Sequence, residues 1–315
     1  MRFSIIVPLY NKESFVEKTL RSVLDQTFAD YEIIVVNDGS KDGSLGVTKR
    51  VLKGIENATV ISQENAGVST ARNNGITAAK GDYICFLDAD DWWEPTFLEE
   101  MDELIMDYPN AGLYCTNYYY VHNGKATIKL GIPTGYFNYC KEYAETLCMI
   151  ATSSSSCCSK NILTEMSGFK PHLKLGEDFD LWIRIALKYG SAILNKPLMY
   201  FNNDVPIKFR ATHHLHKPEN HMLWNLGYLE NEEKTNLDYK QLIDNLRTYG
   251  LMPYFLSREY HDAAQIELEK VDWSRQNPEV RRKYSKPLFV LRAKRWLLNI
   301  AVTIKRFLIQ TIKKK

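Results

Sequence analysis

The sequence lacks both of the glycine-rich motifs that most often mark a phosphate-binding loop. No G-x-G-x-x-G follows a predicted strand, and G-x-x-x-x-G-K-[ST] is absent from all 315 residues. The first motif is typical of dinucleotide-binding sheets and the second of P-loop enzymes. Phosphate binding by this chain would therefore depend on a metal ion and on side chains.

Cysteines with metal-ligand spacing are also missing. Six cysteines are present, but none forms C-x-x-C or a zinc-binding pattern, and we interpret the adjacent Cys157 and Cys158 as packing residues. The amino terminus reaches Pro8, Asn11 and Lys12 too early for the apolar core of a signal peptide. These features favour a reduced, cytoplasmic setting.

Acidic residues are absent from the end of the chain. Residues 281–315 hold twelve Lys or Arg and no Asp or Glu, which leaves 28 basic against 38 acidic residues upstream, or −10 for the body and +12 for the tail. Residues 286–312 have the pattern of a helix with one apolar and one basic side. The longest uncharged central run, 296–304, has nine residues, well below the roughly 20 that span a bilayer.

This basic tail predicts peripheral contact of residues 284–315 with the inner face of the cell membrane, where acidic lipids attract Lys and Arg. In the alternative, the apolar side of the tail packs on the catalytic domain or on a second copy of the chain, as in a homodimer.

Strands and helices alternate in the amino-terminal part. Apolar runs predict strands at 3–7, 32–36, 59–62 and 83–87, with helices between them. In the first of these helices, Ser14 and Glu17 have the spacing of a capping box. The alternation indicates an α/β fold with a mostly parallel central sheet flanked by helices.

Three predicted strands end in polar side chains, at 37–38, 63–65 and 88–91. Open α/β sheets bind ligands beyond the carboxyl ends of their strands. Asp88 and Asp90 are hard oxygen ligands that suit Mg²⁺ or Mn²⁺ carrying a substrate phosphate. The alternative is that Asp90 or Asp91 caps a helix starting near residue 94. We assign Asp91 to such a cap or to support of the loop.

The second half of the chain is less regular. Helices are predicted at 97–105, at 160–168 and from 177 onward, and strands at 112–117 and 192–200. Residues 118–159 lose periodicity, so we expect loops and short strands there, with contacts to a substrate. The predicted organisation is a catalytic domain at 1–218, a helical extension at 219–280 and the basic amphipathic tail at 281–315.

Five motifs occur in order along the chain: IIVPLYN, VVNDGSKDGS, ENAGVSTARNNG, GDYICFLDADDWW and GEDFDLW. In this order they resemble family-2 glycosyltransferases with the GT-A fold, of the kind that builds bacterial cell-surface polysaccharides. The similarity covers roughly residues 3–215 and leaves the tail outside. It implies an inverting transferase with a nucleotide-sugar donor and a divalent metal ion.

The resemblance also implies roles for residues at the strand ends. Asp38 would accept a hydrogen bond from the pyrimidine N3–H, since a carboxylate offers only acceptors. Arg72 would either approach the pyrophosphate or support the acidic loop through an ion pair. Asp88 would contact the ribose or the metal, and Asp90 would be the principal metal ligand. Further residues of the donor nucleotide pocket would be Pro8, Tyr10, Asn11 and Asn65.

On the acceptor side, Asp178 resembles the general base of inverting members, a role commonly worth about 10²- to 10⁴-fold in rate. The alternative is that Glu177 or Asp178 only complements the dipole of the helix that begins there. We place Glu177 beside the acceptor or the diphosphate.

A histidine cluster follows at 213–216. Related enzymes often carry Arg-x-His or Arg-x-x-His on a loop that closes over the diphosphate, so Arg210 with His213 or His214 would touch phosphate or metal. Which histidine aligns is open, and for His216 an ordinary exposed position is an equal alternative.

The sequence therefore predicts a metal-dependent inverting glycosyltransferase that moves a sugar from a nucleotide donor, a UDP sugar by preference, to a hydroxyl of a glycan or lipid-linked glycan. No nucleic-acid partner is expected. One alternative is a metal-dependent sugar-phosphate nucleotidyltransferase, which needs no hydroxyl base at Asp178. Another is a noncatalytic scaffold of a glycan-assembly complex, which would be expected to have lost its site acids.

Overall fold

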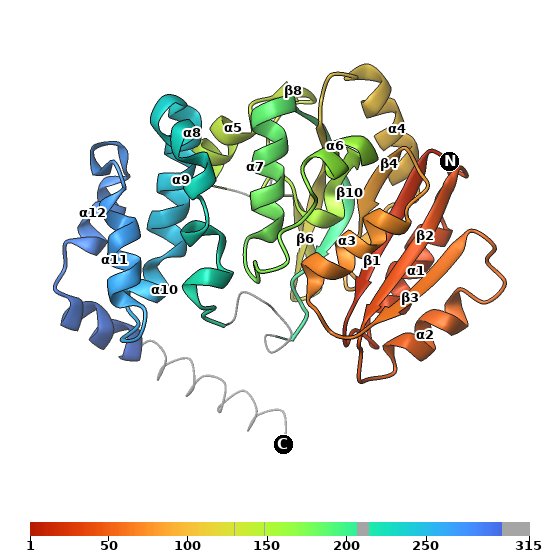
Figure 1. Cartoon of the computed structure of the whole chain (residues 1–315), viewed down its shortest axis with the longest axis horizontal. Helices are drawn as coiled ribbons and strands as arrows, with labels where there is room; N and C mark the ends of the chain where they lie inside the picture. Colours follow the sequence, from red (N-terminus) through yellow and green to blue (C-terminus); the bar gives the residue numbers. More distant parts are fainter. Residues whose placement is uncertain (129, 148, 207–213, 298–315) are drawn as a thin grey trace. The chain divides into compact units, whose positions relative to one another are not determined.

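The computed structural model describes residues 1–128, 130–147, 149–206 and 214–297. Within them a mixed sheet has the strand order β3-β2-β1-β4-β9-β6-β10-β5 (Figure 1). Its first four strands along the chain are parallel to one another, as predicted: β1 (Phe3–Leu9), β2 (Tyr31–Asp38), β3 (Ala58–Gln63) and β4 (Tyr83–Phe86).

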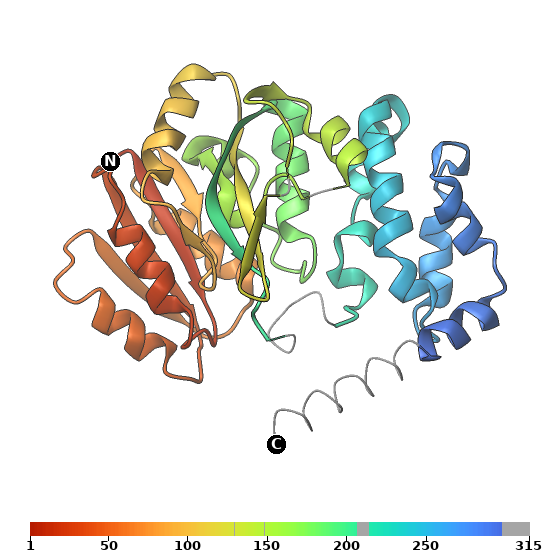
Figure 2. The same ribbon diagram turned by 180° about the vertical axis from the view of Figure 1, so that it is seen from behind.

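The central strands are covered on both faces. Every residue of β1 and β2 is buried, which explains their continuous apolar runs. The helices α3 (Val68–Ala78) and α1 (Val16–Leu24) lie on opposite faces of these strands (Figures 1 and 2). A third helix, α2 (Ser44–Val51), packs beside α1. The carboxyl ends of the four parallel strands therefore share one edge of the sheet.

The predicted capping box at the start of α1 is wrong. Phe15 occupies the N-cap position, and no side chain caps the helix. Glu17 instead forms ion pairs with Arg21 at 2.7 Å and with Arg50 of α2 at 2.9 Å. Arg21 and Arg50 thus occupy the Glu17 carboxylate, which in a capping box would accept a hydrogen bond from the N-cap amide.

A second parallel pair, β6 (Leu113–His122) with β10 (Ser191–Asn202), extends the sheet. Between β4 and β6 lies β9 (Ser156–Ser159), antiparallel to both. Short antiparallel partners complete the described sheet: β5 (Trp92–Trp93), β7 (Lys125–Ile128) and β8 (Gly135–Phe137).

Four helices accompany this half: α4 (Phe97–Asp107), α5 (Tyr139–Thr146), α6 (Lys160–Glu165) and α7 (Glu177–Tyr189). The expectation of only loops and short strands at 118–159 is wrong for α5. Its signals are local: the Asn138 side chain accepts a hydrogen bond from the Lys141 amide at 3.1 Å, and Tyr139 and Tyr143 are buried one turn apart.

The chain divides into two compact units, Met1–Tyr239 and Lys240–Lys315. The first unit also contains α8 (Glu230–Thr235) and the start of α9 (Leu237–Gly250). The second contains α10 (Met252–Phe255), α11 (His261–Glu269) and α12 (Pro278–Tyr284). The domain boundaries proposed from the sequence stay predictions. In the part of the chain that the structure describes, no helix has the length and apolarity needed to cross a membrane.

Candidate functional site

The loops after β1 and β2 are tied together at the carboxyl edge of the sheet. Asn11 adopts a left-handed conformation with φ 51°, and its amide N–H donates to Ser40 Oγ at 3.2 Å. Its side-chain oxygen accepts from the Lys41 amide at 2.8 Å. Pro8 is buried in β1, whereas Tyr10, directly after this strand, is 42% exposed. Asn11 thus joins the loop after β1 to the loop after β2.

Asp38, at the end of β2, is buried and organises the turn after β3. Its carboxylate accepts hydrogen bonds from the backbone amides of Ala66 at 2.8 Å and Gly67 at 2.9 Å. The side-chain amides of Gln63 at 2.8 Å and Asn65 at 3.2 Å also donate to it. A carboxylate has about four lone-pair positions. A base N–H would therefore have to take the place of one of these donors, and the predicted contact to the pyrimidine stays a prediction.

Arg72 of α3 joins two acidic segments that are distant in sequence. It is 3% exposed; its guanidinium donates to Asp88 at 2.8 Å and to Glu177 at 3.0 Å and lies over the ring of Phe169. Burial alone would lower the pKa of Arg72, but the carboxylates of Asp88 and Glu177 raise it above its ordinary value. Of the two roles inferred for Arg72, the structure contains the ion pair with the acidic loop.

The acidic loop after β4 is held by neighbouring strands and by a short turn at Ser154. The Asp88 amide donates to Ser154 Oγ at 3.0 Å, and that hydroxyl donates to Asp91 at 2.6 Å. The other oxygen of Asp91 accepts from the Asn202 amide at 2.8 Å. Because Thr96 is the N-cap residue of α4, Asp91 supports the loop and does not cap the helix. Burial and the neighbouring Asp90 and Asp88 raise the pKa of Asp91 well above its ordinary value.

Asp90 forms an ion pair with Lys12, a residue to which the sequence assigned no role. Both side chains are mostly buried. Burial raises the pKa of Asp90, Lys12 opposes that effect, and Asp88 adds to it. In the sequence, the only indication of this pairing was that Lys12 directly follows Asn11 in the loop after β1. This loop lies at the same edge of the sheet as the acids.

Asp178 lies in the first turn of α7, next to the Arg72 cluster. The helix follows Gly176, whose φ of 80° suits glycine and whose added Cβ would lie 2.9 Å from Met222. The half-buried Asp178 accepts from the Phe179 amide at 2.9 Å. Burial, followed by the charge of Glu177, raises the pKa of Asp178 to about 7, although Arg72 opposes the shift. Such a carboxyl group can take up a proton near neutral pH.

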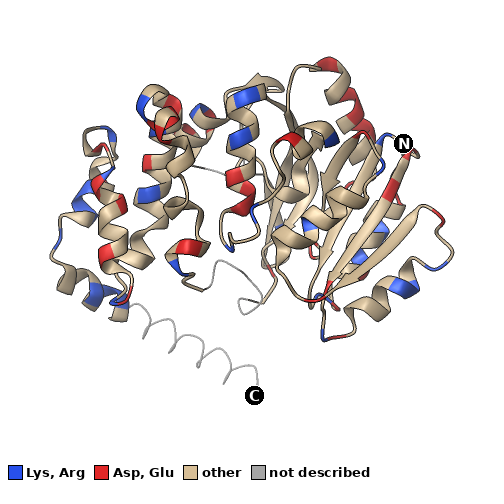
Figure 3. Ribbon diagram, in the orientation of Figure 1, with Lys and Arg blue, Asp and Glu red and all other residues tan. Residues whose placement is uncertain are grey.

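Asp180, two residues further along α7, serves a different purpose. It is fully buried and accepts from Lys170 at 2.8 Å, Arg184 at 2.9 Å and the Tyr228 hydroxyl at 2.6 Å. Figure 3 shows the acidic residues of α7 at its N-terminal end and its basic residues further along, which complements the helix dipole. The first turn of α7 therefore presents Glu177 and Asp178 to the Arg72 cluster and Asp180 to the core.

The acids at the sheet edge fit a divalent cation. Among the described residues, no three His, Cys, Asp or Glu side chains gather into a ready-made metal site. Mg²⁺ typically uses only one or two carboxylates plus substrate phosphates. Asp88, whose side chain is 35% exposed, and Asp90 supply such a pair of hard oxygen donors on one loop.

Arg210 and His213 lie outside the described residues, and His214 is exposed. Trp182 is fully buried in the core. Cys157 and Cys158 are fully buried, and burial raises the pKa of both thiols well above the ordinary value, which agrees with a packing role.

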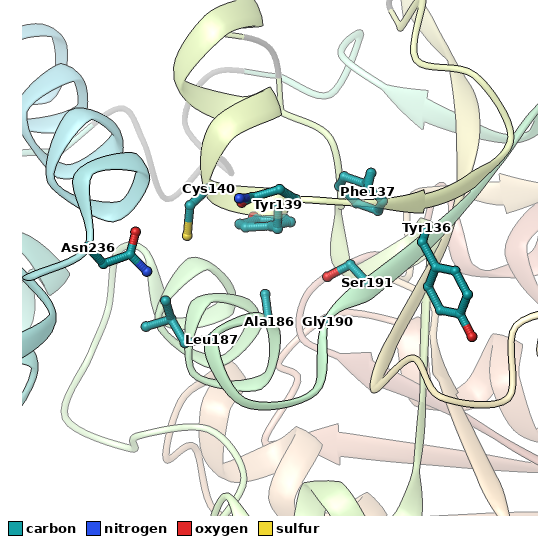
Figure 4. A pocket seen from close by; sticks show the side chains of 10 residues that line it. Tyr136, Phe137, Tyr139, Cys140, Ala186, Leu187, Gly190, Ser191 and Asn236 are labelled. Carbon is teal, nitrogen blue, oxygen red and sulfur yellow. The ribbon is translucent and has the colours of Figure 1, made fainter.

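A cavity of about 480 Å³ lies at the far end of α7, where β10 begins. Tyr139 and Cys140 face Ala186 and Leu187 across it (Figure 4). None of its ten described lining residues is Lys, Arg, His, Asp or Glu. Without cations or metal ligands, this cavity does not suit a diphosphate, and the carboxyl edge of the sheet remains the candidate site.

Comparison with known proteins shows the family to which the amino-terminal part of the chain is similar. Residues 4–168, just over half of the chain, match the family model described as glycosyl transferase family 2. A curated relative, glycosyltransferase GlyA of Streptococcus pneumoniae, is 41% identical over 118 residues; the match covers 38% of this chain and only 17% of GlyA.

Two solved structures show the same fold. The S. aureus TarS 1–349 complex with UDP-GlcNAc is 21% identical with a TM-score of 0.66, over 86% of this chain and 77% of that one. Mannosyltransferase PcManGT from Pyrobaculum calidifontis, in complex with GDP-Man and Mn²⁺, is 16% identical with a TM-score of 0.53, over 87% of this chain and 88% of that one.

Proposed function

The chain belongs to glycosyl transferase family 2, and from that membership we propose that it transfers a sugar from a nucleoside-diphosphate donor, a UDP sugar, to a hydroxyl of a glycan or lipid-linked glycan, with inversion at the anomeric carbon. The observation that carries the proposal is Arg72. Its ion pairs connect Asp88, beyond β4, with Glu177, next to Asp178. The donor-side acids and the proposed base thus belong to one cluster.

The donor nucleotide would bind where the loops after β1, β2 and β3 meet. Pro8, Tyr10, Asn11 and Asn65 would form the pocket, with Asp38 facing the base. The donor class is supported by two neighbours of the same fold, one bound to UDP-GlcNAc and one to GDP-Man with Mn²⁺. The acceptor character of Asp38 favours a base that presents an N–H, as uracil does.

Asp88 and Asp90 would hold Mg²⁺ or Mn²⁺ together with the donor diphosphate. When bound there, the ion supplies positive charge that stabilises the departing nucleoside diphosphate, an effect commonly worth several kcal/mol at the transition state. Asp91 keeps the loop in place through Ser154 and the Asn202 amide. The buried Arg72 orients Asp88 through its ion pair.

Asp178 would act as the general base. Its carboxylate takes the proton of the acceptor hydroxyl while the hydroxyl oxygen forms a bond to the anomeric carbon. The bond from that carbon to the diphosphate oxygen breaks at the opposite face, and its electron pair leaves with the nucleoside diphosphate. A pKa near 7 suits this task, because about half of the groups are ionised at neutral pH and the carboxylate still has the affinity to hold the proton that it receives.

The acceptor side and the tail are further parts of the proposal. Glu177, Arg210, His213 and His214 would contact the acceptor or the diphosphate. The basic tail at 284–315 would hold the protein at the inner face of the cell membrane, near lipid-linked acceptors; residues 298–315 lie outside the described part. Deleting 284–315 should abolish flotation with anionic vesicles. Unchanged flotation would contradict membrane contact and favour packing on this chain or on a second copy.

A screen of nucleotide sugars with Mn²⁺ or Mg²⁺ tests the function, scored by release of nucleoside diphosphate. Weak donor hydrolysis needs no knowledge of the acceptor. We expect metal-dependent release from a UDP sugar, and NMR of the transfer product should show the inverted anomeric configuration. Retained configuration, or pyrophosphate release from a nucleoside triphosphate, would contradict the proposal.

A further inference from the structure

We propose that Lys12 substitutes for the divalent metal ion in the ligand-free protein, holding Asp90 until the metal and a nucleoside diphosphate bind together. The inference rests on the proposed function, because it takes Asp90 to be a metal ligand. It adds a role for a residue outside that proposal: Lys12 couples metal binding to diphosphate binding.

The surrounding structure holds Lys12 and Asp90 in contact. The Lys12 ammonium pairs with Asp90 Oδ2, and each side chain is only 17% exposed. The backbone of Lys12 is fixed as well, since its amide N–H donates to Ser44 Oγ at 2.7 Å. The preceding residue, Asn11, is held in its left-handed conformation by bonds to the loop after β2. Lys12 is thus directed at Asp90 by two strand-end loops.

Lys12 can leave its acidic partner more easily than Arg72 can. Arg72 is enclosed and divides its planar guanidinium between Asp88 and Glu177, an arrangement that favours staying in place. A lysine ammonium is a compact charge on a flexible stem with three rotatable donors. A metal ion at Asp90 would bring a second cation to the carboxylate that Lys12 occupies. Since like charges repel strongly in a mostly buried site, Lys12 must move when the metal binds.

The diphosphate would give the displaced ammonium a new partner. Its oxygens carry negative charge, and lysine is a common phosphate ligand that acts as a point charge. Metal binding frees Lys12 for the diphosphate, and the diphosphate stabilises Lys12 away from Asp90. Each ligand therefore strengthens the binding of the other by the same factor. The metal would bind weakly alone and tightly with the nucleotide.

Mn²⁺ binding measured by electron paramagnetic resonance, without and with UDP, tests this coupling independently of activity. In the wild type we expect UDP to tighten Mn²⁺ binding at least about tenfold, within the usual range of coupling between sites. In Lys12→Gln, Mn²⁺ alone should bind about tenfold tighter than in the wild type, and the effect of UDP should shrink by a similar factor. A damaged fold would lower metal affinity, so a gain cannot come from misfolding.

Lys18→Gln is the matched control, because it removes the same charge nearby. The Lys18 ammonium lies 2.9 Å from the ring centroid of Trp92, two residues after Asp90. It should leave both Mn²⁺ affinities unchanged. If Lys12→Gln behaves like Lys18→Gln, the coupling role is overturned while the proposed function stands. If UDP-dependent Mn²⁺ binding is absent from the wild type or survives Asp90→Asn, the metal site itself is overturned, and the inference falls with it.

Discussion

In the part of the chain that the structure describes, each unit encloses an arginine between two acids, and the surroundings of these two arginines differ. Arg72, in the first unit, is 3% exposed and bridges Asp88 and Glu177. Arg247, in the second, is 1% exposed and contacts Asp244 at 3.6 Å and Glu267 at 3.3 Å. In both units a buried guanidinium interacts with two carboxylates.

The two arginines differ in how far the acids around them are exposed to solvent. The Asp88 side chain is 35% exposed, whereas that of Asp244 is 2% exposed and also receives the Asp272 amide at 3.0 Å. Acids that keep contact with solvent can exchange partners and bind a ligand, while enclosed acids hold helices together. We therefore propose a catalytic role for the Arg72 cluster and a stabilising role for the Arg247 cluster. The predictions below test this contrast, from the largest expected effect to the smallest.

Asp178→Asn should lower the transfer rate by about 10²- to 10⁴-fold, because the amide cannot take the acceptor proton. Asp180→Asn is the matched control in the same helix turn, since Asp180 faces the core. It should reduce stability but keep the rate per folded molecule. Steady-state kinetics normalised to folded protein would measure both variants. Equal losses in the two would contradict the division of α7 into a site acid and a core acid.

Arg247→Met should destabilise the second unit by about 3 to 5 kcal/mol, the usual effect of removing one partner of a buried ion pair. Amide hydrogen exchange would show lost protection in α11 and in the part of α9 after Lys240. Protection in α3 and α7 should persist. Unchanged exchange in α11 would mean that Arg247 does not stabilise this unit.

Arg72→Met should affect activity more than stability. Removing an outer partner of a metal-binding carboxylate typically lowers activity or metal affinity by about 10- to 100-fold. Asp88 would remain partly hydrated, so the loss of stability should be smaller than for Arg247→Met. Turnover and urea unfolding of the two variants would decide. A fully active Arg72→Met protein would remove the observation on which the proposed function depends.

Tyr228→Phe should have the smallest effect. It removes one of three donors to Asp180, while Lys170 and Arg184 remain. A hydrogen bond to a charged group contributes about 1.5 to 3 kcal/mol, and compensation by the remaining partners places the expected loss near the lower end. Thermal unfolding would measure it, with unchanged kcat as the second expected result. A lower kcat would connect Asp180 to catalysis after all.

Much of this arrangement could be predicted from the sequence, because the signals are local. The buried runs that become β1 and β4, the acids directly after β4 and the acidic start of α7 all appear as short motifs. Burial on both faces explains why these strands have continuous apolar runs. The placement of Asp88 and Asp91 on one loop follows directly from their position after a strand.

Contacts between distant segments could not be predicted. The pairing of Lys12 with Asp90 spans 78 residues, and that of Arg72 with Glu177 spans 105. Only the sheet order brings these residues together, and no periodicity encodes it. The capping box failed for the same reason, since one of the partners of Glu17, Arg50, comes from another helix.

The central claim, that Asp178 in the Arg72 cluster is the base, depends on groups from several elements. Glu177 on α7, Arg72 on α3, Asp88 after β4 and Tyr139 on α5 all interact with it electrostatically. Because the folded pKa of about 7 lies above the ordinary value of 3.8, the folded state binds the proton more tightly between those values. Stability should therefore fall as pH rises through this window, and Asp178→Asn should remove that contribution.

The pH dependence of kcat/KM for transfer from the active donor is the most direct test of this claim, because it reports the ionisation of the free enzyme. We predict that kcat/KM rises about tenfold per pH unit at low pH and levels off above a pKa near 7, and that Asp178→Asn loses this limb. A profile that is flat through neutral pH, or a variant that keeps the same limb, would contradict the account.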